Sequence, residues 1–268
     1  MYRSVYDLKT FYTSPAGLGV QRILQKHIES FWPDVKNLRI MGCGYALPYL
    51  QYFRDQQAER VFAMMPAGQG AHQWPEDAKN LVFLSDESAI PLENSSVDRI
   101  ILIHDLECNE HLQSHLSEIW RILKANGRLL VIVPNRTGFW ARADWSPFGH
   151  GSPFSLPQLC HSLRDNLFVQ ERTESALFLL PLPMKIIMRS AIFWEHMGKI
   201  VWPFLGGVHI VEASKQIYAG VDRTPGSKVP ARLRGLIGAR PATPGLSGSG
   251  FTPLQPRRHP PAESRESK

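Results

Sequence analysis

Cysteine is scarce in this chain of 268 residues, which has only Cys43, Cys108 and Cys160. They are odd in number and far apart, and none stands in a CxxC spacing, which argues against a disulfide framework and a zinc ribbon. We expect no metal site. Few, scattered cysteines are typical of a reducing compartment, so we expect a cytoplasmic location.

Long apolar runs are also lacking. The longest uncharged apolar stretch, residues 175–184, is too short and too interrupted by proline to span a bilayer. The first seven residues lack the apolar core of a secretory signal. We therefore expect neither a transmembrane segment nor a secretory leader.

Most of the chain carries no excess of charge of either sign. The formal net charge is +6, but residues 221–268 hold nine Lys/Arg and three Asp/Glu, so residues 1–220 are formally neutral. A neutral body gives no electrostatic footprint for nucleic acid, and we expect none to bind there. Residues 221–268 also hold eight prolines and show no periodicity, which predicts a disordered basic tail after a domain at 1–220. Nucleic-acid association through that tail remains an open alternative.

What the chain does have is a regular alternation of strand and helix patterns. Mainly apolar segments, which suit parallel strands buried on both faces, occur at 38–41, 60–65, 81–84, 99–104 and 128–133, and residues 100–103 form an unbroken apolar run. Helical spacing occurs at 15–31, 47–57, 112–123 and 156–163, with Asn126-Gly127 expected to stop the third helix. Further strands are expected at 168–171 and 208–218. The alternation predicts an α/β fold with a doubly wound, mostly parallel sheet and helices on both faces.

The most informative segment is Leu38–Leu50. An apolar run ends at Gly42 and Gly44, and a helix with Pro48 in its first turn follows at once. Glycines allow a ligand to approach the backbone, and a helix N-terminus offers free N–H groups to a polar or anionic ligand. This unit predicts a nucleotide-type binding site, although an ordinary tight turn explains it as well.

The order of motifs resembles the class I S-adenosylmethionine-dependent methyltransferases, in particular the type 11 methyltransferase domain family, a seven-stranded Rossmann-like fold. Residues 40–44, Ile-Met-Gly-Cys-Gly, stand at the family's first glycine motif, and residues 86–92 match its Asp-Ala-x-x-Leu-Pro-type segment. Residues 96–99 match the entry to its fourth strand, and residues 118–127 match its Glu-x-x-Arg-Val-Leu-Lys-Pro-Gly-Gly helix ending. The resemblance implies S-adenosylmethionine as cofactor. Its implied contacts are Gly42, Cys43, Gly44, Met65, Asp86 and Glu87.

The chain departs from this family pattern at three positions. Ile40 and Met65 stand where the family commonly has acidic residues, and Ala46 stands where it has a third glycine. A hydrogen bond to a charged group is worth about 1.5–3 kcal/mol, so loss of the ribose carboxylate at Met65 predicts cofactor binding weakened about 10–100-fold.

Candidate reactive groups follow the cofactor motifs. His104 ends the fourth apolar run, where side chains face the ligand crevice of such sheets. We therefore take His104 as the candidate catalytic base. The alternative is that it is a polar strand end that faces solvent. His111 and His115 are interpreted as a solvated helix face. Residues 149–155 are expected to form a loop over an acceptor pocket, with an ordinary surface loop as the alternative. The apolar region 177–205, with Trp194 and Trp202, is expected to pack as core, or alternatively to cap a substrate or meet a membrane surface.

The sequence therefore predicts S-adenosylmethionine-dependent methyl transfer to a small, partly hydrophobic molecule. The alternative is a methyltransferase-like binding or scaffold protein without catalytic activity. The sequence decides neither the acceptor nor the oligomeric state.

Overall fold

The computed structural model describes residues 3–178 and 206–215, which all belong to the first of two units into which the chain divides, Met1–Ala219. The helices are α1 (Val5–Thr13), α2 (Pro15–Phe31), α3 (Leu47–Asp55), α4 (Leu112–Ile122) and α5 (Leu156–Asp165), with short 3-10 turns at Trp140–Arg142 and Pro147–Gly149. The strands are β1 (Arg39–Gly44), β2 (Arg60–Pro66), β3 (Val82–Ser85), β4 (Val97–Ile103), β5 (Leu123–Pro134), β6 (Phe168–Ala176) and β7 (Val208–Lys215).

The seven strands form one sheet in the order β3-β2-β1-β4-β5-β7-β6. Strands β1 to β5 are parallel to their neighbours, whereas β7 is antiparallel to both β5 and β6. The order reverses direction at β1, because the chain runs from β1 out to β3 and returns through β4 beside it. Ligands of such sheets bind beyond the carboxyl ends of the strands at this reversal.

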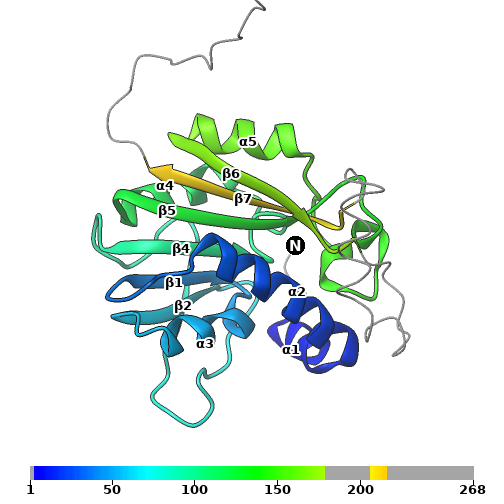
Figure 1. Cartoon of the computed structure of the whole chain (residues 1–268), viewed down its shortest axis with the longest axis horizontal. Helices are drawn as coiled ribbons and strands as arrows, with labels where there is room; N and C mark the ends of the chain where they lie inside the picture. The colour runs from blue at the N-terminus through cyan, green and yellow to red at the C-terminus, as the bar shows by residue number, and fades with distance from the viewer. Residues whose placement is uncertain (1–2, 179–205, 216–268) are drawn as a thin grey trace, which may run out of the picture. The chain divides into compact units, whose positions relative to one another are not determined.

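Helices cover both faces of the sheet (Figure 1). One apolar core joins α1, α2 and α3 to alternate strand residues such as Ile40, Ile101 and Ile132. The second core joins α4 and α5 to the strand residues that alternate with those of the first core, such as Met41 and Val131. Strand residues alternate between the two cores because successive side chains point to opposite faces, so the buried part of each central strand is apolar on both faces. The predicted doubly wound α/β fold is confirmed.

Helix boundaries follow from local chemistry. Ser14 caps α2 by accepting from the Gly17 N–H, and Pro15 takes the first helical position, where no N–H is needed. Ser155 and Gln158 form a reciprocal capping box at the start of α5. Both starts agree with the sequence prediction.

Two predicted boundaries were wrong. Helix α4 ends at Ile122 because Leu123 already pairs with Val97 of β4. Asn126-Gly127 therefore does not stop the helix but lies inside β5, where Asn126 has φ +58°. Strand β6 continues to Ala176 because it pairs with β7 along its length. The predicted apolar region 177–205, the end of the last strand and the tail fall wholly or largely outside the described residues.

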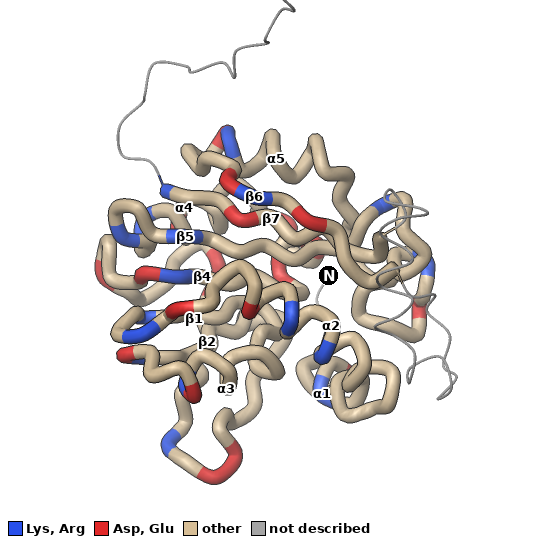
Figure 2. Tube along the Cα trace, in the orientation of Figure 1, with Lys and Arg blue, Asp and Glu red and all other residues tan. Residues whose placement is uncertain are grey.

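Charged residues of both signs occur along the edge of the sheet where the parallel strands begin (Figure 2). Lys124 Nζ is 2.8 Å from the Asp98 carboxylate, and Arg39 is 2.9 Å from that of Glu59. Such pairing leaves little net field along this edge. Among the described residues, no helix is both long enough and apolar enough to cross a membrane.

Candidate cofactor and active site

The glycine turn at the end of β1 lies directly against the end of β4. Gly44 has φ +69°, which glycine adopts without a steric penalty, and a Cβ there would collide with the Ile103 carbonyl and lie 2.8 Å from Asp105 Cβ. The Tyr45 N–H donates to the Ile103 carbonyl at 2.7 Å. The close approach of the two strand ends therefore requires glycine at position 44.

Gly42 is required for a different contact. A Cβ at this position would lie 2.7 Å from the Cβ of Ala46 and 3.1 Å from the methyl groups of Leu50. Ala46 is the residue that stands at the family's third glycine. Gly42 thus lets α3 pack closely on β1, so both glycines are needed by the fold itself, whether or not a ligand is bound.

His104 is held in an unusual conformation at the end of β4. Its φ is +53°, uncommon for a residue with a side chain, and the side chain is buried. Its Nε2 lies 2.8 Å from the Tyr12 hydroxyl, and the Phe148 ring is 4.7 Å away between centroids. His104 therefore faces into the molecule beside the glycine turn, and its interpretation as a solvent-facing strand end was wrong.

The hydrogen bonds around Tyr12 fix the direction of proton donation. Tyr49 donates its hydroxyl proton to the Tyr12 oxygen at 3.2 Å, so the Tyr12 proton is available to His104 Nε2. With Nε2 accepting, the neutral ring carries its proton on Nδ1, which lies 3.4 Å from Glu107 Oε1. Burial raises the pKa of Tyr12 well above its usual value, so this hydroxyl keeps its proton at neutral pH.

Glu107 carries a buried carboxylate next to His104. Its side chain is 1% exposed, and neither oxygen accepts a hydrogen bond from the described residues. A buried charge without compensation costs several kcal/mol, so this carboxylate is suited to a positive group nearby. Glu107 is a site residue that the sequence analysis missed, because nothing in the sequence shows that it is buried.

A second buried pair links the end of β4 to α4. His115 Nε2 is 2.7 Å from Asp105 Oδ2, and its Nδ1 is 3.2 Å from the carbonyl oxygen of Glu87. Burial acts to lower the pKa of His115, but the charge and hydrogen bond of Asp105 outweigh it and raise that pKa. His115 is fully buried, so its interpretation as a solvated helix face was wrong, whereas His111 is exposed.

The remaining predicted cofactor residues stand on the neighbouring strand ends. Cys43 pairs in register with Met64, so Met65 lies level with Gly44 and is completely buried. Asp86 follows the end of β3 and is exposed, with its carboxylate accepting from the Ser88 N–H at 2.8 Å and the Ser88 hydroxyl at 2.6 Å. These hydrogen bonds from Ser88 lower the pKa of Asp86. The structure therefore places the predicted residues at one edge of the sheet.

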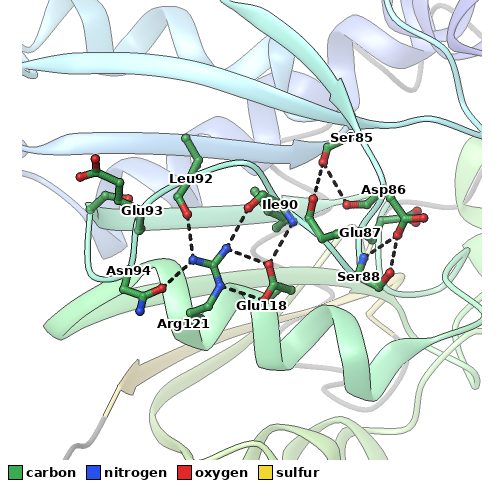
Figure 3. A network of polar contacts seen from close by, with 12 residues as sticks. Ser85, Asp86, Glu87, Ser88, Ile90, Leu92, Glu93, Asn94, Glu118 and Arg121 are labelled. Carbon is green, nitrogen blue, oxygen red and sulfur yellow. Dashed lines mark hydrogen bonds and ion pairs between the residues drawn. The ribbon is translucent and has the colours of Figure 1, made fainter.

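Arg121 fixes the segment that carries Asp86 and Glu87 (Figure 3). Its guanidinium donates to the carbonyl oxygens of Ile90 and Leu92, both at 2.8 Å, and forms two bonds with the Glu118 carboxylate. Glu118 also accepts from the Ile90 N–H at 3.0 Å. The Glu-x-x-Arg motif of α4 thus holds the β3–β4 connection in place.

The predicted loop 149–155 lies against the segment after β4. The Ser152 N–H donates to the Glu107 carbonyl oxygen at 2.7 Å, and Gly151, with φ +76°, leaves no room for a Cβ beside that carbonyl. The loop thus packs against the backbone of the residue that carries the buried carboxylate. The loop therefore lies beside the end of β4, and its place over an acceptor pocket stays a prediction.

The residues present fit S-adenosylmethionine in charge. That cofactor carries a sulfonium and an ammonium, and Asp105 Oδ1, Glu87 Oε1 and both Glu107 oxygens are buried without a hydrogen-bond partner in the described structure. Within residues 3–178 and 206–215, no three His, Cys, Asp or Glu side chains are arranged to hold a metal ion. The unpartnered carboxylate oxygens are suited to the sulfonium and ammonium groups of that cofactor. Met65, in contrast, offers no acceptor for ribose hydroxyls.

This fold and this strand-end crevice define the class I methyltransferase type. The family model described as a methyltransferase domain matches residues 40–131, which run from β1 into β5. The resemblance to S-adenosylmethionine-dependent methyltransferases expected from the sequence is confirmed for this part of the chain, which matches the methyltransferase domain model. A comparison with curated protein sequences finds no match.

Solved structures show the same fold. A Mesorhizobium loti S-adenosylmethionine-dependent methyltransferase is 13% identical with a TM-score of 0.51, covering 71% of this chain and 96% of its own. An Archaeoglobus fulgidus SAM-dependent methyltransferase is 15% identical with a TM-score of 0.50, covering 73% and 94%. A geranyl diphosphate methyltransferase is 13% identical with a TM-score of 0.50, covering 72% and 78%. At these identities the likeness concerns the fold.

Proposed function

We propose that this protein transfers a methyl group from S-adenosylmethionine to a small, partly hydrophobic molecule. The observation that carries this proposal is the meeting of the glycine turn with His104, Asp105 and Glu107 at the end of β4. The matched methyltransferase domain supports it. The neighbour named for geranyl diphosphate supports an acceptor of this kind.

The acidic groups beside Gly44 are the proposed cofactor contacts. Asp105 and Glu107 hold buried oxygens without a partner, so they are suited to the positive groups of the cofactor, while Gly42, Cys43, Gly44, Met65, Asp86 and Glu87 line the strand ends. The cofactor, when bound, supplies an electrophilic methyl group. The chain's own contribution is to align the acceptor with it and to exclude water.

His104 is the proposed proton acceptor. An acceptor hydroxyl or ammonium must lose a proton when it is methylated, and a histidine next to a carboxylate is stabilised once it is protonated. Nε2 holds the lone pair that takes the proton, after which its N–H donates to the Tyr12 oxygen in place of accepting from the Tyr12 hydroxyl. Glu107 lies on the Nδ1 side and stabilises the charged ring. Tyr12 and Glu107 are thus positioning residues for His104.

The test is transfer of label from tritiated S-adenosylmethionine to a panel of small hydroxyl, amine and carboxyl compounds. We expect label in at least one compound, and we expect His104→Ala to slow the transfer while changing cofactor affinity less than threefold. Equal loss of turnover and affinity would assign His104 to the cofactor pocket. Cofactor binding without transfer to any compound would favour the alternative, a methyltransferase-like binding protein.

A further inference from the structure

An open pocket of about 400 Å³ lies between α1, α2, the start of α3 and the β2–β3 connection. Its lining residues are Lys9, Tyr12, Thr13, Leu18, Gln21, Tyr45, Leu47, Pro48, His72 and Trp74. None of the predicted cofactor residues lines it, and neither does His104. It is therefore a cavity distinct from the strand-end crevice, with a volume in the range of small-molecule sites.

Aromatic rings lie along the floor and rim of the pocket, with Tyr12 and Tyr45 largely buried in its floor. Tyr12 and Tyr45 are stacked, with centroids 5.6 Å apart and ring planes 27° from parallel, and His72 lies 6.0 Å from Tyr45. Trp74 adds an indole, and Arg54 lies 5.6 Å from its ring centroid. Stacked and tilted aromatic walls favour a planar ring system over a saturated chain of the same size.

Lys9 gives the pocket a positive edge. No carboxylate is among the lining residues, so Lys9 is the charged group that faces a ligand there. Its Nζ lies 2.7 Å from Glu76 Oε1, and the Glu76 side chain is 75% exposed. An ion pair exposed to this degree contributes little, so a carboxylate bound in the pocket can replace Glu76 as the partner of Lys9.

We propose that this pocket binds a planar aromatic molecule that carries a carboxylate. The ring lies among Tyr12, Tyr45 and Trp74, and the carboxylate meets Lys9. The proposal goes beyond methyl transfer and does not depend on it, because it rests on a cavity that shares no residue with the proposed cofactor contacts. Tyr12 connects the two regions, since its ring lines the pocket and its hydroxyl bonds His104.

Calorimetric titration of the full chain with indole-3-carboxylate, without cofactor, tests the proposal. We expect saturable binding below millimolar concentration and at least tenfold weaker binding of cyclohexanecarboxylate, which is not planar. Lys9→Met should weaken binding about tenfold through loss of a charge-assisted bond. Glu76→Gln should strengthen it about threefold, because it removes the competing partner of Lys9.

Lys36→Met is the matched control, since Lys36 is exposed and lies outside the pocket lining. Each variant is checked for an unchanged thermal melt before titration. Absence of binding at 5 mM, equal affinity for cyclohexanecarboxylate, or unchanged affinity in Lys9→Met would each overturn the proposal. Failure of cofactor binding in a separate titration would overturn the proposed function and leave this result standing.

Discussion

The Tyr12 hydroxyl lies 2.8 Å from His104 Nε2, although 92 positions separate the two residues. This contact ties the first helix to the end of the fourth strand. Tyr49 of α3 donates to the same hydroxyl at 3.2 Å, so three elements meet at one buried hydrogen-bond chain. The candidate base is thereby fixed in orientation before any ligand arrives, which is the condition for a preorganised site.

Replacing Tyr12 with Phe should lower the free energy of unfolding by about 1–2 kcal/mol, because it leaves the buried His104 Nε2 without its donor. Urea unfolding measures the change. Tyr6→Phe, on the same helix but 69% exposed, is the control and should change it by less than about 0.5 kcal/mol. Equal effects of the two substitutions would show that the Tyr12–His104 bond contributes nothing to stability.

Replacing Glu107 with Gln should separate charge from shape. The variant should melt no lower than the wild type, because it removes a buried carboxylate that lacks a hydrogen-bond partner. Its affinity for S-adenosylmethionine should fall more than its affinity for S-adenosylhomocysteine, which lacks the sulfonium charge. Calorimetry with both compounds measures this, with the exposed Glu93→Gln as control. An equal fall for both compounds would place Glu107 away from the sulfonium.

Replacing Arg121 with Met should lower the free energy of unfolding by about 2 kcal/mol or more. It removes the donors that hold the carbonyl oxygens of Ile90 and Leu92 and leaves Glu118 without its positively charged partner. Urea unfolding is again the measurement, and the exposed Arg164→Met is the control. A loss no larger than that of the control would show that the network is dispensable.

Replacing His115 with Gln should change the pH dependence of stability. The pKa of His115 is raised in the folded state, so its contribution is complete below the unfolded value of about 6.5 and disappears as the pH rises through the folded value. The difference in unfolding free energy between wild type and variant should therefore be larger at pH 6 than at pH 9. The exposed His161→Gln is the control. A difference that is constant or grows with pH contradicts the Asp105–His115 pairing.

The order of elements could be predicted from the sequence because each central strand is apolar on both faces. Runs such as 99–104 and 128–133 leave little choice between strand and helix when turns bound them closely. The end of α4 could not be predicted, because Leu123 continues the helical apolar spacing and only its pairing with Val97 assigns it to β5. Tertiary pairing overrode the local pattern there.

The site could be predicted in part. The strand-end positions of Gly44, Met65 and His104 follow from the topology alone. The burial of Glu107 and His115 could not be predicted, because a charged residue in a loop and a histidine on an amphipathic helix are usually solvated. Their burial depends on Ser152 and Asp105, which approach from other parts of the chain.

Titration of the wild-type protein with S-adenosylmethionine by calorimetry tests the central claim most directly. The proposed function predicts one site per chain, with an affinity weaker than usual for S-adenosylmethionine-dependent methyltransferases, because Met65 offers the ribose no carboxylate. Gly42 and Gly44 are unsuitable for testing this by substitution, since the fold itself needs them. One saturable binding event agrees with the account, whereas no heat at millimolar cofactor from folded protein would contradict it.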